Sequence, residues 1–383
     1  MEATGKVCIL SMQNVDNMGS LLQAYALKQT VECLGWDVEF LDIQPNHADN
    51  LLLGGKQLGY AQEQEQRGVA GKIKKIDKYT ANRIQIKLKT VLGKKYYSAF
   101  RKQYLGIENQ SAHYDCCIIG SDEVFNCMNT GGWGFTSQLF GNVAQAETVI
   151  TYAASCGATK YQDLPVQAAQ RIRWAFQKVQ GFSVRDRNTL EFVSQLTDSP
   201  VLQHLDPVLI YDFSREMAQS PMPPVPNHYC LVYSYYNRIH TPGEIQAIQD
   251  FCRRHHLVPV TVGAPQFWIR RHMECTPFQC LKLFQTADFV ITDTFHGTIF
   301  SAKYADKFAV LTRPSNYNKL SDLIERLGIQ EHHIPSLENL EIVFSKKKDQ
   351  KAILHRTLQA REDAVHYLAG ALEKCAAQKE FAK

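Results

Sequence analysis

The chain has 383 residues, roughly two to three times the size of a typical domain, so we expect two domains rather than one. Apolar residues make up 45% and charged residues 21% of the chain, which excludes a disordered, collagen-like or coiled-coil protein. The 42 Lys and Arg residues barely outnumber the 38 Asp and Glu residues, which argues against a general nucleic-acid-binding protein. No apolar run is long enough to span a membrane and no secretory signal opens the chain, so we expect a cytoplasmic protein.

The first half of the chain alternates strand and helix signals. Apolar runs and alternating apolar residues predict strands at 5–11, 37–43, 116–119, 148–154, 181–184 and 208–210. Apolar residues at helical spacing predict helices at 20–34 and 165–178. Because a helical connection between two strands usually makes them parallel neighbours, this order predicts a parallel sheet.

A basic segment runs from Arg67 to Lys102, with twelve basic residues and a single acid, Asp77. Two interpretations stay open. The segment is either a solvated helical face or a patch that contacts an anionic membrane surface or an acceptor linked to a lipid phosphate. In the second case the basic insertion at about residues 50–110 forms the acceptor side, and the protein associates peripherally with the inner face of the membrane.

Four prolines between Pro221 and Pro226 forbid a helix or a central strand, and we place a domain boundary there. Beyond it, the same patterns predict strands at 229–235, 258–262, 289–292 and 308–311, and helices at 242–255, 276–285 and 297–304. The tail at 346–383 is expected to form one long helix that packs back on the first domain. The expected fold is therefore α/β, with Rossmann-like domains at 1–220 and 228–345 that face each other across a cleft, as in the GT-B architecture.

In open α/β sheets, ligands bind beyond the carboxyl ends of the strands, so the residues that follow each strand are candidates for the site. Asn17 and Gly19 lie in the polar turn after the first strand. The helix that starts there either offers free backbone N–H groups to an anion or simply begins with an ordinary capped turn. Asp122 follows the strand at 116–119 and is either an N-cap or a functional carboxylate.

Arg185 directly follows a buried strand, where its planar guanidinium needs an anionic partner. That partner is either a substrate carboxylate or phosphate, or a nearby acid such as Asp186 or Asp206. His296 ends a strand one residue before Gly297, which opens a helix, so its imidazole can exchange a proton near neutral pH. The alternative is a structural histidine.

Several specific motifs are missing. There is no GxGxxG after the first strand, although Asp42 stands where a ribose-binding acid would lie, so an NAD enzyme is only weakly supported. The sequence also lacks GxxxxGK[ST], HExxH, GxSxG and DxD. The eleven cysteines sit mostly in apolar runs, as reduced core thiols do, and the spacing of His272, Cys275 and Cys280 lacks the CxxC pair of a typical zinc site. We therefore expect no metal and no organic cofactor.

An ordered set of segments between residues 6 and 329 resembles the polysaccharide pyruvyl transferase family. These segments are Asn17-x-Gly19, Leu22–Leu27, Gly120–Asn126, Tyr152–Gly157, Ser183–Asp186, Leu205–Val208 and Thr292–Gly297. The resemblance implies a GT-B-like fold and the transfer of the enolpyruvyl carbons of phosphoenolpyruvate to two hydroxyls of a sugar. The product is a cyclic ketal on a surface or exopolysaccharide intermediate, and phosphate is released. The basic segment described above raises the alternative that this intermediate is linked to a lipid.

The resemblance also implies roles for individual residues. His296 would act as the acid/base, Asp122 as a base or acceptor ligand, and Arg185 as a clamp on the donor. Further substrate-binding candidates are Asn17, Gly19, Ser121, Ser155, Thr294, Gly297, Arg313 and Lys319. Some family members carry an arginine at the position of Thr294, so a donor ligand is either absent here or supplied by Arg187, Lys303, Arg313 or Lys319.

Two other functions remain in competition. A GT-B fold also suits a nucleotide-sugar-dependent glycosyltransferase, since a fold does not fix its chemistry. The second rival is a catalytically silent binding protein that keeps the cleft but has lost the clamp at Thr294. Stabilisation by phosphoenolpyruvate, and not by nucleotide sugars, would separate the first hypothesis from the glycosyltransferase.

Overall fold

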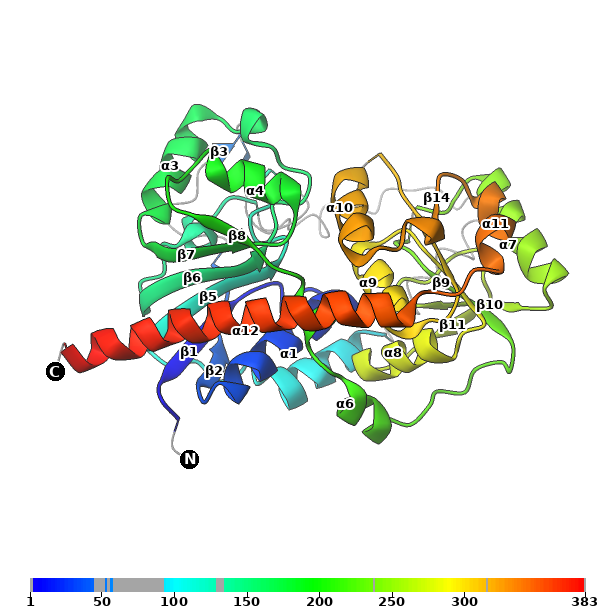
Figure 1. Cartoon of the computed structure of the whole chain (residues 1–383), viewed down its shortest axis with the longest axis horizontal. Coiled ribbons are helices and arrows are strands. Elements are labelled where there is room, and N and C mark those ends of the chain that lie inside the picture. The colour runs from blue at the N-terminus through cyan, green and yellow to red at the C-terminus, as the bar shows by residue number, and fades with distance from the viewer. Residues whose placement is uncertain are drawn as a thin grey trace, which may run out of the picture.

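The computed structural model describes residues 3–44, 93–128, 134–236, 238–314 and 316–381, together with the backbone of a short hairpin formed by β3 (Leu52–Leu53) and β4 (Lys56–Gln57). Two parallel sheets of six strands dominate the described chain, and helices pack on both faces of each. Figure 1 shows the two sheets side by side, the first in blue to green and the second in green to orange. The expected α/β fold with two Rossmann-like domains is confirmed.

In the first domain, the earliest strand lies second from one edge of the sheet. The strands, in spatial order, are β2 (Asp37–Phe40), β1 (Lys6–Leu10), β5 (Tyr114–Asp122), β6 (Ala146–Ala154), β7 (Val179–Val184) and β8 (Val201–Gln203). The helices are α1 (Met18–Cys33), α3 (Val166–Phe176), α4 (Arg187–Ser194), α5 (Pro207–Ile210) and α6 (Ser214–Gln219), with a helical stretch at 93–105. Because strand order reverses between β1 and β5, the loops after these strands diverge and leave room for a ligand there.

The predicted strand at 208–210 is wrong, because these residues form α5. Asp206 caps the helix by accepting a hydrogen bond from the backbone N–H of Val208, and Pro207 occupies the first helical position. Proline is well suited to that position because its ring fixes φ near the helical value. The last strand of the sheet is instead β8, a three-residue edge strand whose sequence has no clear alternation.

The second domain repeats the same plan. Its strands, in spatial order, are β11 (Arg271–Met273), β10 (Val258–Val262), β9 (Tyr229–Tyr233), β12 (Phe289–Thr292), β13 (Phe308–Leu311) and β14 (His333–Ile334). Its helices are α7 (Pro242–Arg254), α8 (Pro277–Thr286), α9 (Phe295–Tyr304), α10 (Tyr317–Leu327) and α11 (Leu340–Phe344). The order reverses between β9 and β12, which creates a second switch point.

The C-terminal helix α12 (Gln350–Phe381) returns to the first domain, as predicted. Figure 1 shows it in red, reaching from the second domain across the first. Near the middle of this helix, the Tyr367 hydroxyl donates a hydrogen bond to the backbone oxygen of Thr151 in β6 (2.9 Å). Gly181 of β7 accommodates this tyrosine, because a Cβ there would lie 2.9 Å from the Tyr367 hydroxyl.

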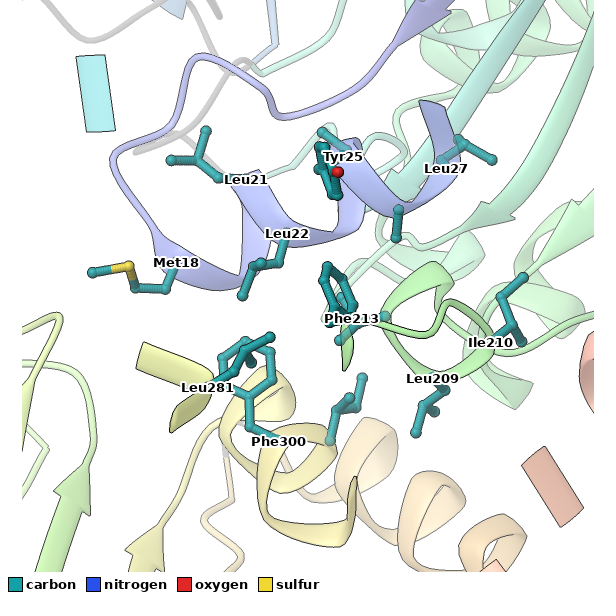
Figure 2. Close-up of a cluster of buried hydrophobic side chains, with 14 of the residues drawn as sticks. Met18, Leu21, Leu22, Tyr25, Leu27, Leu209, Ile210, Phe213, Leu281 and Phe300 are labelled. Atoms are coloured by element: carbon teal, nitrogen blue, oxygen red, sulfur yellow. The ribbon is translucent and has the colours of Figure 1, made fainter. Parts of the chain in front are cut away.

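One hydrophobic core continues through both domains. Figure 2 shows Leu22 of α1 pointing toward Leu281 of α8 and Phe300 of α9, with Phe213 between α1 and the second domain. All four side chains are fully buried. Burial of apolar surface stabilises a fold by about 25 cal/mol per Å², so this shared core holds the two sheets in a fixed relation.

The cysteines behave as the sequence indicated. All eleven are free thiols, and all except Cys33 are buried. Among the described helices, none is long and apolar enough to cross a membrane. Within the same ranges, no three His, Cys, Asp or Glu side chains gather in a way that could hold a metal ion.

Candidate active site

His296 lies in the first turn of α9, at the carboxyl end of β12. The helix starts two residues earlier than predicted because Thr294, not Gly297, marks its beginning. The Thr294 hydroxyl is the N-cap and accepts a hydrogen bond from the Gly297 N–H (3.0 Å). Gly297 is also needed for space, since a Cβ there would lie 2.1 Å from the Thr292 hydroxyl.

The first turn of α1 packs directly against the imidazole of His296. A Cβ on Gly19 would lie 2.1 Å from Cγ of the histidine, so only glycine permits this contact. Asn17 caps the helix, and its side-chain oxygen accepts hydrogen bonds from the N–H groups of Gly19 (2.8 Å) and Ser20 (3.3 Å). These two amides are therefore engaged within the protein, and of the two alternatives the helix begins with a capped turn in this conformation.

Asp206 links the two strongest candidates from the sequence. Its Oδ2 atom accepts a hydrogen bond from Nη1 of Arg185 (3.1 Å) and lies 3.5 Å from Nε2 of His296. Arg185 follows β7 of the first domain, whereas His296 belongs to the second, so a single carboxylate connects the domains at the site. Arg185 and Asp206 are 3% and 1% exposed, which makes this a buried charge cluster.

The charges of this cluster support one another. Burial tends to raise the pKa of Asp206, but the nearby His296 and Arg185 outweigh it and lower that pKa to about 2. Burial tends to lower the pKa of Arg185, and the surrounding carboxylates, first Asp122 and then Asp206, raise it above its usual value. The guanidinium also lies over the ring of Phe295 at 4.0 Å, a cation–π contact.

Asp122 ends β5 at the same place, and it is not the N-cap of a helix. It accepts hydrogen bonds from the Ser20 hydroxyl (2.8 Å) and from Arg185 (3.4 Å). Its backbone has a positive φ of 77°, a conformation that non-glycine residues rarely adopt. Such strain is typical of functional sites, where the surrounding structure holds a side chain in one direction.

A second interdomain pair lies beside this cluster. Nζ of Lys319, on α10, lies 2.6 Å from a carboxylate oxygen of Glu123, which follows β5. Burial tends to raise the pKa of Glu123, but Lys319 overcomes it and lowers the pKa to about 2. Glu123 belongs to the segment Gly120–Asn126 but is not among the site residues that the sequence predicts.

Two cavities meet at His296, one at each switch point. We call the first the arginine cavity; it has a volume of about 280 Å³ and is lined by Met12, Val15, Asn17, Ser20, Asp122, Glu123, Val124, Asn126, Gly134, Arg185, Tyr235, Phe295, His296 and Lys319. We call the second the tyrosine cavity; it has a volume of about 340 Å³ and is lined by Val15, Asp16, Asn17, Met18, Gly93, Lys94, Tyr97, Tyr233, Ser234, Tyr235, Tyr236, Gly263, Ala264, Pro265, Thr294 and His296. His296, Asn17, Val15 and Tyr235 belong to both.

A model of the polysaccharide pyruvyl transferase family matches residues 17–313, which is more than half of the chain. The chain belongs to this family. The match confirms the resemblance seen in the sequence. It identifies this pyruvyl transferase homologue as a transferase, and the family implies a polysaccharide acceptor. A search of curated proteins found no match.

Solved structures offer only distant likeness to this pyruvyl transferase homologue. The glycosyltransferase SnogD from Streptomyces nogalater is 13% identical over 99% of each chain, with a TM-score of 0.41. A UDP-GlcNAc 2-epimerase from Methanocaldococcus jannaschii, in complex with UDP-GlcNAc and UDP, is 9% identical over 91% of this chain and 97% of its own, with a TM-score of 0.45. We base the fold on the strand order above and draw nothing about function from these structures.

Several predicted residues lie behind the cavities rather than on their walls. Ser121 donates to Asp206 (3.3 Å), and Ser155 donates to Asp186 (2.7 Å), which in turn caps α4. The Arg313 guanidinium is bound by Asp293 (2.6 Å) and Glu244 (2.9 Å). These contacts support neighbouring backbone and carboxylates.

The four residues that could replace the arginine of other family members at position 294 differ in their surroundings. Arg187 is exposed and pairs with Glu325 on α10 (3.3 Å). Lys303 is half-buried and donates to backbone oxygens, and Arg313 is held by two carboxylates as described. Only Lys319, among these four, lines the arginine cavity.

Much of the basic segment, residues 67–92, lies outside the described residues, including Lys72, Lys74, Lys75 and Lys78. Of the described part, Lys94 lines the tyrosine cavity. Arg101 instead makes its contacts within the first domain: it pairs with Asp16 (2.7 Å) and donates a hydrogen bond to the backbone oxygen of Gln13 (2.8 Å).

Besides Glu123, sequence reasoning missed Asp206. It was considered only as a salt-bridge partner of Arg185. Two signals pointed to it: the Asp-Pro pair that opens a helix, and its position shortly after a strand. Neither signal indicates a contact with His296, which is ninety positions away in sequence and is brought close only by the packing of α5 against α9.

Proposed function

We propose that this protein transfers a pyruvyl group from phosphoenolpyruvate to two hydroxyls of a saccharide, forming a cyclic ketal and releasing phosphate. The observation that carries the proposal is the buried Arg185–Asp206–His296 cluster at the junction of two cavities. It combines a proton-exchanging imidazole, an anion-binding guanidinium and a carboxylate that faces both of them. Family membership supplies the reaction class.

The arginine cavity suits the anionic donor. Arg185 and Lys319 lie on its wall beside their partners Asp122 and Glu123, and Nε of Arg185 is buried without a hydrogen-bond partner among the described residues. The first turn of α9 also borders this cavity, and the first N–H groups of a helix are partly positive and lack intrahelical partners. Lys319 takes the place of the arginine that some family members carry at the position of Thr294.

The imidazole of His296 is set up to act through Nδ1. Its Nε2 atom is buried toward Asp206, which leaves Nδ1 as the ring nitrogen for a substrate. We infer that Nδ1–H protonates the terminal CH₂ carbon of the donor, which becomes the methyl group of the ketal. The positive charge that develops on the adjacent carbon resembles an oxocarbenium ion, and the nearby carboxylates of Asp122 and Asp206 stabilise it.

The remaining steps balance without any cofactor. One saccharide hydroxyl attacks the cationic carbon and loses its proton to Asp122 or to the now neutral His296. Phosphate then leaves with the electron pair of its C–O bond and takes up a proton. The second hydroxyl attacks the same carbon and loses its proton, so that two protons leave the hydroxyls, one ends on the methyl group and one on phosphate.

The first test is ligand binding by the full-length protein. Isothermal titration with phosphoenolpyruvate is expected to show binding to the parent, and Arg185→Lys and Lys319→Met are each expected to weaken it by about tenfold, the loss of one good charge-assisted contact. Arg187→Gln is the matched control, since it removes a neighbouring but exposed arginine. Binding of UDP or GDP sugars in place of phosphoenolpyruvate would instead favour the glycosyltransferase.

The second test is turnover. The protein is incubated with phosphoenolpyruvate and a panel of methyl glycosides and oligosaccharides, and phosphate release and the product mass are followed. His296→Asn is expected to slow the reaction by about 10²- to 10⁴-fold, because general acid–base help typically contributes that much. Unchanged turnover in a folded His296→Asn protein would remove this histidine from the mechanism.

A further inference from the structure

We propose that the tyrosine cavity binds a sugar ring of the acceptor and that the arginine cavity binds the donor, with His296 between them. This inference rests on the proposed function and assigns each substrate to one of the two cavities. It concerns the space at the carboxyl ends of β9, β10 and β12, whose walls include Tyr97, Tyr233 and Tyr236.

The walls of the tyrosine cavity match the chemistry of a sugar. A pyranose has one face of C–H groups, which packs on aromatic rings, and a rim of hydroxyls, which need hydrogen-bond partners. Within the described part of the chain, the hydroxyls of Tyr97, Tyr233 and Tyr236 make no hydrogen bond, so they remain available. The ring of Tyr233 is fixed by edge contacts with Phe284 and Phe300.

The polar groups on the walls differ between the two cavities. The arginine cavity has Arg185 and Lys319 on its wall, paired with Asp122 and Glu123 of the same wall, together with the start of α9. Lys94 is the lysine on the wall of the tyrosine cavity. Asp16, the acid of the tyrosine cavity, is already paired with Arg101 at 2.7 Å. An anionic donor in the arginine cavity can accept a hydrogen bond from Nε of Arg185, which is buried without a partner among the described residues. The tyrosine cavity offers hydroxyls instead, which suit a neutral sugar.

The shared wall makes the assignment chemically productive. Because His296 and Asn17 line both cavities, a hydroxyl of a ring in one cavity can approach the enol carbon of a donor in the other. The 340 Å³ of the tyrosine cavity also lies within the range of about 300–1,000 Å³ that is common for small-molecule sites.

The test measures the two ligands separately on the full-length protein. Saturation-transfer NMR follows methyl glycosides of glucose, galactose, mannose and N-acetylglucosamine, and isothermal titration follows phosphoenolpyruvate. Tyr236→Ala is expected to weaken glycoside binding by about tenfold, and Tyr97→Phe, which removes only a hydroxyl, by severalfold. Both variants are expected to leave the affinity for phosphoenolpyruvate unchanged.

Two control variants test whether the effect is specific to the tyrosine cavity. Lys319→Met is expected to show the converse pattern, with weaker binding of phosphoenolpyruvate and unchanged glycoside binding. Tyr317→Ala removes a tyrosine that is 54% exposed and lies outside both cavities, so it is expected to change neither ligand.

The outcomes separate this inference from the proposed function. Absence of glycoside saturation transfer in the parent would overturn the assignment, as would tyrosine variants that weaken phosphoenolpyruvate and leave glycosides alone. In that last case, the proposed function, transfer of a pyruvyl group, would not be contradicted. If the parent does not bind phosphoenolpyruvate, the proposed function fails, while the glycoside measurements still decide whether the tyrosine cavity is a sugar site.

Discussion

At the scale of single residues, Asp206 contributes most to holding the site together. Its carboxylate faces an arginine of one domain and a histidine of the other, and its second oxygen caps α5. Removal of water makes such attractions stronger, but it also makes an unpaired charge costly. The side chain is therefore difficult to replace, even by its amide.

Asp206→Asn is expected to destabilise the protein by on the order of 3 kcal/mol at pH 7, because it leaves Arg185 and His296 without their shared partner. The effect should depend on pH. Because the pKa of Asp206 is lowered to about 2, its stabilisation is complete above the ordinary carboxyl pKa of about 3.9 and is lost as the pH falls through about 2. Thermal unfolding of the parent and variant should therefore converge toward pH 2, whereas Asp198→Asn, at an exposed site, should track the parent throughout.

Gly19→Ala tests the contact between α1 and the imidazole. The added methyl group would lie 2.1 Å from Cγ of His296, so the ring must move and turnover should fall by about 10²-fold or more. Gly370→Ala is the matched control, because this glycine of α12 has open space around it and alanine favours a helix by about 0.5–1 kcal/mol. Full turnover in Gly19→Ala would contradict the packing described here.

At the scale of elements, α5 and α9 act as a pair. Their first turns meet through Asp206 and His296, and Lys303 near the end of α9 donates hydrogen bonds to the backbone oxygens of Val208 (2.7 Å) and Tyr211 at the end of α5. A four-residue helix cannot satisfy its own last carbonyls, so Lys303 supplies the missing donors. The pair is fixed at both ends.

Lys303→Met should reveal this contact through the pH dependence of stability. Burial lowers the pKa of Lys303 to about 7, and Asp212 only partly opposes this. Between about pH 7 and the ordinary lysine pKa of about 10.4, the unfolded chain binds a proton that the folded protein lacks, so the stability of the parent rises with pH. Relative to Lys303→Met, the unfolding midpoint of the parent should therefore increase from pH 7 to 10. Lys351→Met, at an exposed position, should not alter the slope.

Regular elements were predictable because their signals are local. The strands at β1, β5 and β12 and the helix α1 follow from apolar runs and spacing alone. Edge strands such as β8 and β14 are too short to carry a pattern, and α5 was misread because three apolar residues fit a strand as well as a helix. His296 and Arg185 could be predicted because strand ends form sites, whereas Asp206 depends on how two helices pack, which no local pattern records.

At the scale of the whole molecule, α12 connects the two domains. It contacts α5, β5 and β6 in the first domain and α10 in the second, and Lys348 just before it donates to the backbone oxygen of Ala302 in α9 (3.1 Å). Together with the core shared by α1, α8 and α9, this predicts that the domains unfold together.

Leu368→Ala tests that expectation. Leu368 is fully buried in the shared core, so the substitution should cost about 2–5 kcal/mol and lower one common transition in calorimetry. Leu358→Ala on the same helix is the control, since this leucine is 48% exposed and its loss should have little effect. Two separate transitions, with only one of them shifted, would show that α12 does not couple the domains.

The wall shared by the two cavities has a consequence for kinetics. If donor and acceptor meet at His296, both must be bound before any bond changes, and no pyruvyl group rests on the protein between two half-reactions. Double-reciprocal plots at several fixed concentrations of the second substrate should then intersect. Parallel lines, the signature of a ping-pong scheme, would point to a covalent intermediate on a side chain instead.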